Sequence, residues 1–86
     1  MGNNEFILKS IDLVRGYYYD FLNLSLDYDD IYVVWSCKTL QNNKALLSTN
    51  VSDGLYFEVT YNGDKKEFYF DAYKKVLNKC ISDILY

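Results

Sequence analysis

The chain has 86 residues, a formal net charge of −3 and an unusual supply of rings, with ten tyrosines, five phenylalanines and one tryptophan. This length predicts a single domain over residues 1–86, and the 50% apolar content excludes intrinsic disorder. The acidic balance gives no general attraction to nucleic acid or anionic membrane, and no apolar run approaches the roughly 20 residues that span a bilayer. We find no secretion signal, so we expect a cytoplasmic protein in which Cys37 and Cys80 are reduced and buried, with a disulfide between them as the alternative.

The first segment, about residues 4–25, has the spacing of an amphipathic helix. Its first apolar row is Ile7, Ile11, Val14, Tyr18 and Leu22, and a second row of Phe6, Leu13, Tyr17 and Phe21 widens the same face. Asn3 or Asn4 suits the N-cap position. The acids of residues 27–30 are unfavourable at a helix C-terminus, so we expect the helix to end before them.

Four short segments have the β-branched and aromatic content, and the two-residue alternation, that are typical of strands. They cover about residues 31–40, 44–49, 54–61 and 65–70. In the first, alternation places Ile31, Val33, Trp35 and Cys37 on one face and Tyr32, Val34, Ser36 and Lys38 on the other. We expect Trp35 to anchor the core, with a role in binding as the alternative.

The last two of these segments are joined by turn-forming residues and form a hairpin. With a turn centred on residues 62 and 63, Glu58 would lie opposite Glu67, which is unfavourable because both are negative. With a turn centred on residues 63 and 64, or with a four-residue loop, Val59 lies opposite Phe68 instead. We predict the second register.

Residues 72–85 show the clearest helical pattern in the chain. Its apolar stripe is Tyr73, Val76, Leu77, Cys80, Ile81, Ile84 and Leu85. Two helical stripes need a shared apolar surface, and one face of the sheet supplies it with Val33, Trp35, Phe57, Val59, Phe68 and Phe70. We therefore predict an α+β domain, a four-stranded antiparallel β-meander with an N-terminal and a C-terminal helix packed on one face.

The runs VVWSCKTLQNNKALLS and DGLYFEVTYNGDKKEFYFDAYKK, within residues 29–75, resemble a family of short proteins from phages and prophages of low-GC Gram-positive bacteria. That family is a domain of unknown function. The resemblance implies a setting, a phage or prophage gene expressed inside a bacterial cell, and carries over no functional residue.

Enzymatic chemistry has little support in the sequence, which holds no histidine, the commonest general base and metal ligand. We expect no enzyme, no cofactor and no catalytic residue. The acids Asp27, Asp29 and Asp30 are the one cluster with oxygen ligands for Ca²⁺ or Mg²⁺, but they lack the glycine and distal glutamate of a calcium loop. We interpret them as a solvated acidic turn, with a bound cation as the alternative.

Protein–protein contact is the function that we expect, because the sheet face opposite the predicted core is aromatic. It carries Tyr32, Val34, Tyr56 and Tyr69, and tyrosine is enriched at interfaces. The partner is a second copy of the chain or a different protein. The alternative function is nucleic-acid binding, with the lysines of the hairpin and the last helix as contacts: Lys65, Lys66, Lys74, Lys75 and Lys79.

Overall fold

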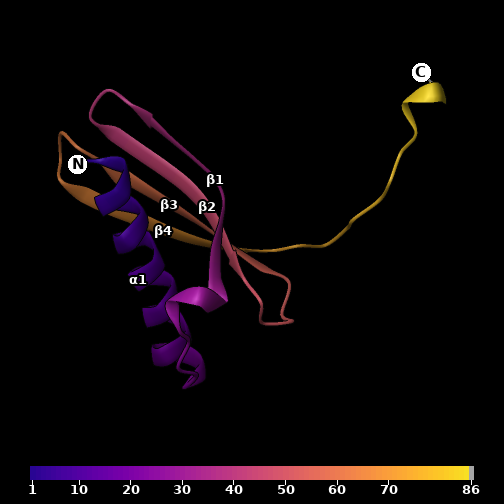
Figure 1. The fold of residues 1–86 in the computed structure, drawn as a ribbon, viewed down its shortest axis with the longest axis horizontal. Coiled ribbons are helices and arrows are strands. Elements are labelled where there is room, and N and C mark those ends of the chain that lie inside the picture. Colours follow the sequence, from indigo (N-terminus) through magenta and orange to yellow (C-terminus); the bar gives the residue numbers. More distant parts are fainter. Residues whose placement is uncertain (86) are drawn as a thin grey trace.

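The computed structural model describes residues 1–85, so Tyr86 of the predicted domain and the side chain of Leu85 in the predicted stripe lie outside the described part. The elements follow one another as α1 (Asn3–Leu22), a 3₁₀ turn η1 (Tyr28–Asp30), β1 (Ile31–Thr39), β2 (Asn42–Thr49), β3 (Leu55–Asn62), β4 (Glu67–Lys74) and a 3₁₀ turn η2 (Asp83–Leu85) (Figure 1). The predicted strands are therefore confirmed, with β4 beginning two residues later and ending four residues later than expected.

The four strands form one antiparallel sheet in the order β1-β2-β3-β4, which confirms the predicted meander. The helix α1 packs on one face of this sheet. The buried apolar residues between them are Phe6, Val14, Tyr18, Leu26, Ile31, Ala45, Leu47, Phe57 and Val59. Val33, Phe68 and Phe70 are partly buried against this core, so most of the predicted core face of the sheet is correct.

The buried stripe of α1 differs from the predicted one by a small rotation of the helix. Its fully buried positions are Phe6, Ser10, Val14 and Tyr18, spaced four residues apart. Ser10 is tolerated in this stripe because its hydroxyl donates a hydrogen bond of 2.8 Å to the carbonyl of Phe6. The helix ends at Leu22, three residues earlier than predicted, where Asn23 takes the left-handed conformation with φ of 53°. Neither Asn3 nor Asn4 is the N-cap, since Gly2 occupies that position.

A partly buried hydrogen bond ties α1 to the turn between β2 and β3. The hydroxyl of Tyr18 donates to the Asp53 carboxylate over 2.6 Å, and the second carboxylate oxygen of Asp53 accepts the backbone N–H of Leu55 at 3.1 Å. Burial, followed by the hydrogen bond to Asp53, raises the pKa of Tyr18 to about 12. The helix and the turn are thus fixed to each other by a contact that favours the neutral phenol.

Both registers considered for the β3–β4 hairpin are wrong. Val59 pairs with Phe70, two residues along β4 from the predicted partner, and Glu58 pairs with Asp71. The side-chain carbonyl of Asn62 accepts hydrogen bonds of 3.1 and 3.2 Å from the two backbone N–H groups that follow Gly63, and Lys66 has φ of 54°. This local turn chemistry sets a four-residue loop at residues 63–66. Because the shift is two residues, the side chains keep the faces predicted for them.

The helix predicted over residues 72–85 is not present in the structure. Its first residues belong to β4, where Tyr73 pairs with Tyr56 and Lys74 with Leu55. Residues 75–82 have no regular secondary structure and run away from the sheet, ending in the short turn η2 (Figure 1). A segment of about ten residues is too short to hold a helix in water without a partner surface. The predicted pair of helices on one face is thus reduced to α1 alone within residues 1–85.

Candidate functional site

A β-bulge in β1 moves Trp35 out of the predicted core. Val33 pairs with Leu47, but Trp35 pairs with Leu46, so Val34 is an extra residue without its own partner on β2. From Trp35 onward the side chains of β1 therefore point to the faces opposite to those predicted. Trp35 is 43% exposed on the side of the sheet turned away from α1, so its expected role as a core anchor is wrong.

The sheet face turned away from α1, which we call the open face, carries five aromatic residues: Tyr32, Trp35, Tyr56, Tyr69 and Tyr73. Cross-strand pairing arranges the open face in rows. The first row is Tyr32, Ser48, Tyr56 and Tyr73, and the second is Trp35, Leu46, Glu58 and Asp71. Within residues 1–85 no helix or strand covers this face.

The first two rows of the open face surround a shallow groove of about 370 Å³, lined by Trp35, Leu46, Tyr56, Glu58, Tyr73, Lys74 and Lys75. Its walls are aromatic and its rim is charged. The Lys75 ammonium lies 5.7 Å from the centre of the Tyr56 ring, a cation–π distance. Glu58 lies opposite the like-charged Asp71 on β4. Its carboxylate forms an ion pair with the Lys44 ammonium, 3.5 Å away on β2. Such a surface suits a partner that offers both apolar and charged groups.

The structure places the predicted contact residues on the open face but not in one cluster. Tyr32 and Tyr56 share the first row, and Val34 lies exposed at the bulge beside them. Tyr69 is two rows away, about 13 Å along β4 from Tyr73. Its hydroxyl donates to Glu67 at 2.6 Å, and this hydrogen bond raises the pKa of Tyr69.

Sequence reasoning did not place Trp35 and Tyr73 on the open face, although it kept a role in binding as the alternative for Trp35. The alternation that placed Tyr69 on this face extends to Tyr73, and would have found it if the strand had been continued past residue 70. No comparable signal marks the bulge at Val34.

The lysines of the alternative nucleic-acid site do not come together. Lys65 and Lys66 lie in the loop before β4, whereas Lys74 closes that strand, about 25 Å away along it. Lys75 borders the groove of the open face, and Lys79 lies in the C-terminal segment.

The acids of residues 27–30 build the turn η1. One carboxylate oxygen of Asp30 accepts the backbone N–H of Asp27 at 2.9 Å, and the other accepts the side-chain amide of Asn50 at 3.0 Å. These two hydrogen bonds, that of Asn50 first, lower the pKa of Asp30. No group of three or more acidic or cysteine side chains within residues 1–85 is arranged to hold a metal ion.

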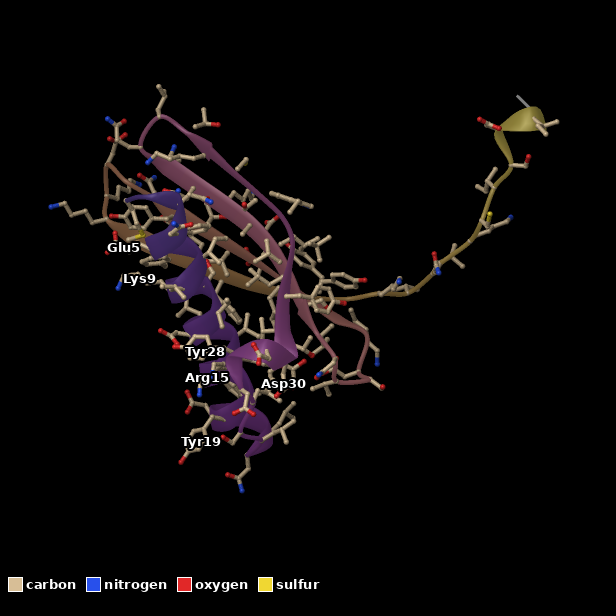
Figure 2. The ribbon with its side chains drawn as sticks, viewed as in Figure 1. Glu5, Lys9, Arg15, Tyr19, Tyr28 and Asp30 are labelled. Carbon is tan, nitrogen blue, oxygen red and sulfur yellow. The ribbon has the colours of Figure 1, made fainter. Side chains whose placement is uncertain are left out.

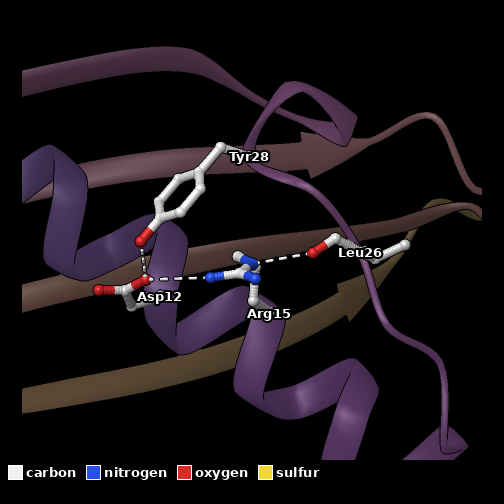
Figure 3. Close-up of polar contacts among 4 residues, drawn as sticks. All are labelled: Asp12, Arg15, Leu26 and Tyr28. Atoms are coloured by element: carbon white, nitrogen blue, oxygen red, sulfur yellow. Dashed lines mark hydrogen bonds and ion pairs between the residues drawn. The ribbon is translucent and has the colours of Figure 1, made fainter.

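A second polar cluster fastens the segment before β1 to α1 (Figure 3). Arg15 donates a hydrogen bond of 2.8 Å to the carbonyl of Leu26, and its guanidinium lies 4.5 Å from the centre of the Tyr28 ring. The Tyr28 hydroxyl donates to Asp12, which raises the pKa of Tyr28, and Asp12 also pairs with Arg15 at 3.6 Å. These contacts are structural, since each joins two parts of the same fold.

The two thiols are unpaired and exposed, so their expected burial is wrong. Cys37 follows the bulge on the edge strand β1, and Cys80 lies in the C-terminal segment.

Residues 7–83 match the model of a family described as "Family of unknown function (DUF6275)". No curated protein and no solved structure matches the chain. No helix within residues 1–85 is long and apolar enough to cross a membrane.

Proposed function

The chain belongs to the family of unknown function DUF6275, and from this premise we propose that it acts by protein–protein contact through the open face of its sheet. The observation that carries the proposal is the gathering of Tyr32, Trp35, Tyr56 and Tyr73 in two adjoining rows of the open face. Tyrosine and tryptophan give large contact areas at a low cost in conformational entropy, and they dominate the energy of many interfaces.

The setting that we propose is a phage or prophage accessory protein in the cytoplasm of a low-GC Gram-positive bacterium. The resemblance within residues 29–75 supports this setting. The role is contact rather than catalysis, and the partner is either a second copy or a different protein of the phage or host.

The test compares the wild-type chain with a triple variant, Tyr32→Ser, Tyr56→Ser and Tyr69→Ser. All three side chains lie on the open face, so the variant should fold, as far-UV circular dichroism would report. Each protein serves as bait in a lysate of a lysogenic host, and the mass of each is followed by sedimentation over a range of concentrations. We expect the wild type to form a complex that the triple variant does not form.

Two results would count against this function. Equal capture and equal mass for the two baits at every concentration would show that the open face is not a contact surface. Retardation of DNA at low salt, abolished by moderate salt and by Lys65→Ala with Lys66→Ala, would instead favour the nucleic-acid alternative.

A further inference from the structure

A second surface of the molecule is incompletely covered, on the same side of the sheet as α1. Four strands spaced about 4.8 Å apart place the outer two about 14 Å from each other, and a helix is about 10 Å wide. One helix therefore cannot cover this face. α1 lies over β1, β2 and β3. It reaches β4 through two ring pairs, Phe6 with Phe68 and Tyr17 with Phe70, whose ring centres lie 6.4 and 6.2 Å apart.

The gap beside α1 is an apolar groove, which we call the β4 groove, formed by Leu13, Tyr17, Phe21, Phe68 and Phe70. It consists of two adjoining hollows of about 280 and 230 Å³. Phe21 at its end is 74% exposed. Its rim on α1 carries Lys9, Asp12 and Asp20, of which Asp12 is already paired with Arg15 and the Tyr28 hydroxyl.

The C-terminal segment offers a surface that fits this groove. Its side chains stand clear of the rest of the chain (Figure 2), and Val76, Leu77, Ile81 and Ile84 are between 60% and 95% exposed. With Cys80, these residues have the spacing of one face of a helix. Within residues 76–84 the charged side chains are Lys79 and Asp83, so the surface that would enter the groove is mainly apolar.

The geometry of the strand end indicates that the segment fills the groove of another molecule. The backbone N–H of Lys75 donates to the carbonyl of Gly54 at 2.8 Å, so the chain is still held along β4 at that residue. The apolar stripe begins at the next residue, Val76. A strand and a helix that pack on each other are usually joined by two to six residues. No free residue is left for that reversal, whereas a second copy can receive the segment without one.

We propose that residues 76–84 of one copy form a helix in the β4 groove of a second copy, and that the exchange is reciprocal. A two-fold symmetric dimer then fills both grooves with identical contacts. Each sheet gains the second helix on its α1 side that its width requires. The dimer does not use the open face, so it is independent of the proposed function.

Sedimentation equilibrium of the full 86-residue chain tests the exchange. We expect the mass to rise from 10.2 kDa towards twice that value with concentration, and the helical signal in circular dichroism to rise with it. The segment variant Leu77→Ser with Ile81→Ser should weaken dimerisation at least about tenfold, since buried apolar anchors carry most of the energy of an interface. The groove variant Leu13→Gln with Phe21→Gln should do the same.

A matched control and a mixing experiment separate the exchange from non-specific apolar association. Leu8 and Leu40 are also exposed apolar residues but line neither hollow, so Leu8→Gln with Leu40→Gln should leave the dimer unchanged. An equimolar mixture of the segment and groove variants should recover dimers, because each pair retains one intact segment on one intact groove. A wild type that stays monomeric, or a mixture that stays monomeric, would overturn the proposal. The exchange would also be overturned if the triple variant of Tyr32, Tyr56 and Tyr69 lost the dimer while the segment variant kept it. That result would leave the proposed function in place.

Discussion

Replacing Tyr18 by phenylalanine tests the contact that fixes α1 to the β2–β3 turn. The change removes a fully buried hydroxyl whose hydrogen bond of 2.6 Å ends on the carboxylate of Asp53. A hydrogen bond to a charged group contributes about 1.5–3 kcal/mol. We therefore expect Tyr18→Phe to lower the free energy of unfolding by about 2 kcal/mol at pH 8, measured by urea unfolding.

The pKa of Tyr18 gives the same prediction a pH dependence. The folded-state pKa of about 12 lies above the ordinary value of 10.0, so the folded protein holds this proton more tightly than the unfolded chain. The resulting stabilisation is fully present below pH 10 and is lost as the pH rises from 10 to 12. A difference of two pKa units corresponds to about 3 kcal/mol. The wild type should thus lose its advantage over Tyr18→Phe across this interval.

Tyr19 supplies the control for this experiment. It lies next to Tyr18 on α1 but is exposed (Figure 2), so Tyr19→Phe should change the free energy of unfolding by less than about 0.5 kcal/mol. The reasoning is refuted if Tyr18→Phe is as stable as the wild type at pH 8, or if the difference between them persists unchanged at pH 12.

Three further substitutions are checked by the same unfolding measurement. A Cβ at Gly63 would lie 2.1 Å from the carbonyl oxygen of Gln41, so Gly63→Ala should push the two hairpin loops apart and lower the free energy of unfolding by about 1–3 kcal/mol. A Cβ at Gly16 meets nothing within 4 Å, so Gly16→Ala should instead raise it by about 1 kcal/mol through helix propensity, and an equal loss at both glycines would contradict the packing described. The buried amide of Asn43 has no hydrogen-bond partner within the described part of the chain, so Asn43→Leu should raise the free energy of unfolding by about 1 kcal/mol, and a loss of that size would show that the amide is satisfied.

Strand positions were predictable because alternation of apolar and polar residues is a local property. The sequence run from residue 55 to 61 indicates both the strand β3 and its buried side chains Phe57 and Val59, and the structure agrees. Pairing register was not predictable in the same way. The register depends on the side chain of Asn62, whose hydrogen bonds stabilise one loop among several that the sequence permits.

The errors at Trp35 and in the C-terminal segment have physical causes that a single sequence does not reveal. One extra residue at Val34 reverses the faces of all later side chains in β1, yet nothing in the run VVWSC distinguishes a bulge from regular alternation. The helical period of residues 76–84 is real, but a helix of this length forms on a surface that buries its stripe. Within residues 1–85 the segment packs against no such surface, and its apolar side chains are exposed. The predicted open face therefore contained Tyr32, Val34, Tyr56 and Tyr69. Trp35 and Tyr73, which the structure places there, were absent from that prediction.

Acrylamide quenching of Trp35 tests the central claim, that the open face is the contact surface, most directly. Trp35 is the one tryptophan of the sequence and lies half-exposed in the second row of that face, so its fluorescence reports on this surface alone. We predict that quenching falls and the emission shifts to shorter wavelength when the protein forms its complex with the captured partner. Quenching and emission that stay constant while the complex forms would contradict the claim, since the open face would then be as wet in the complex as in the free chain.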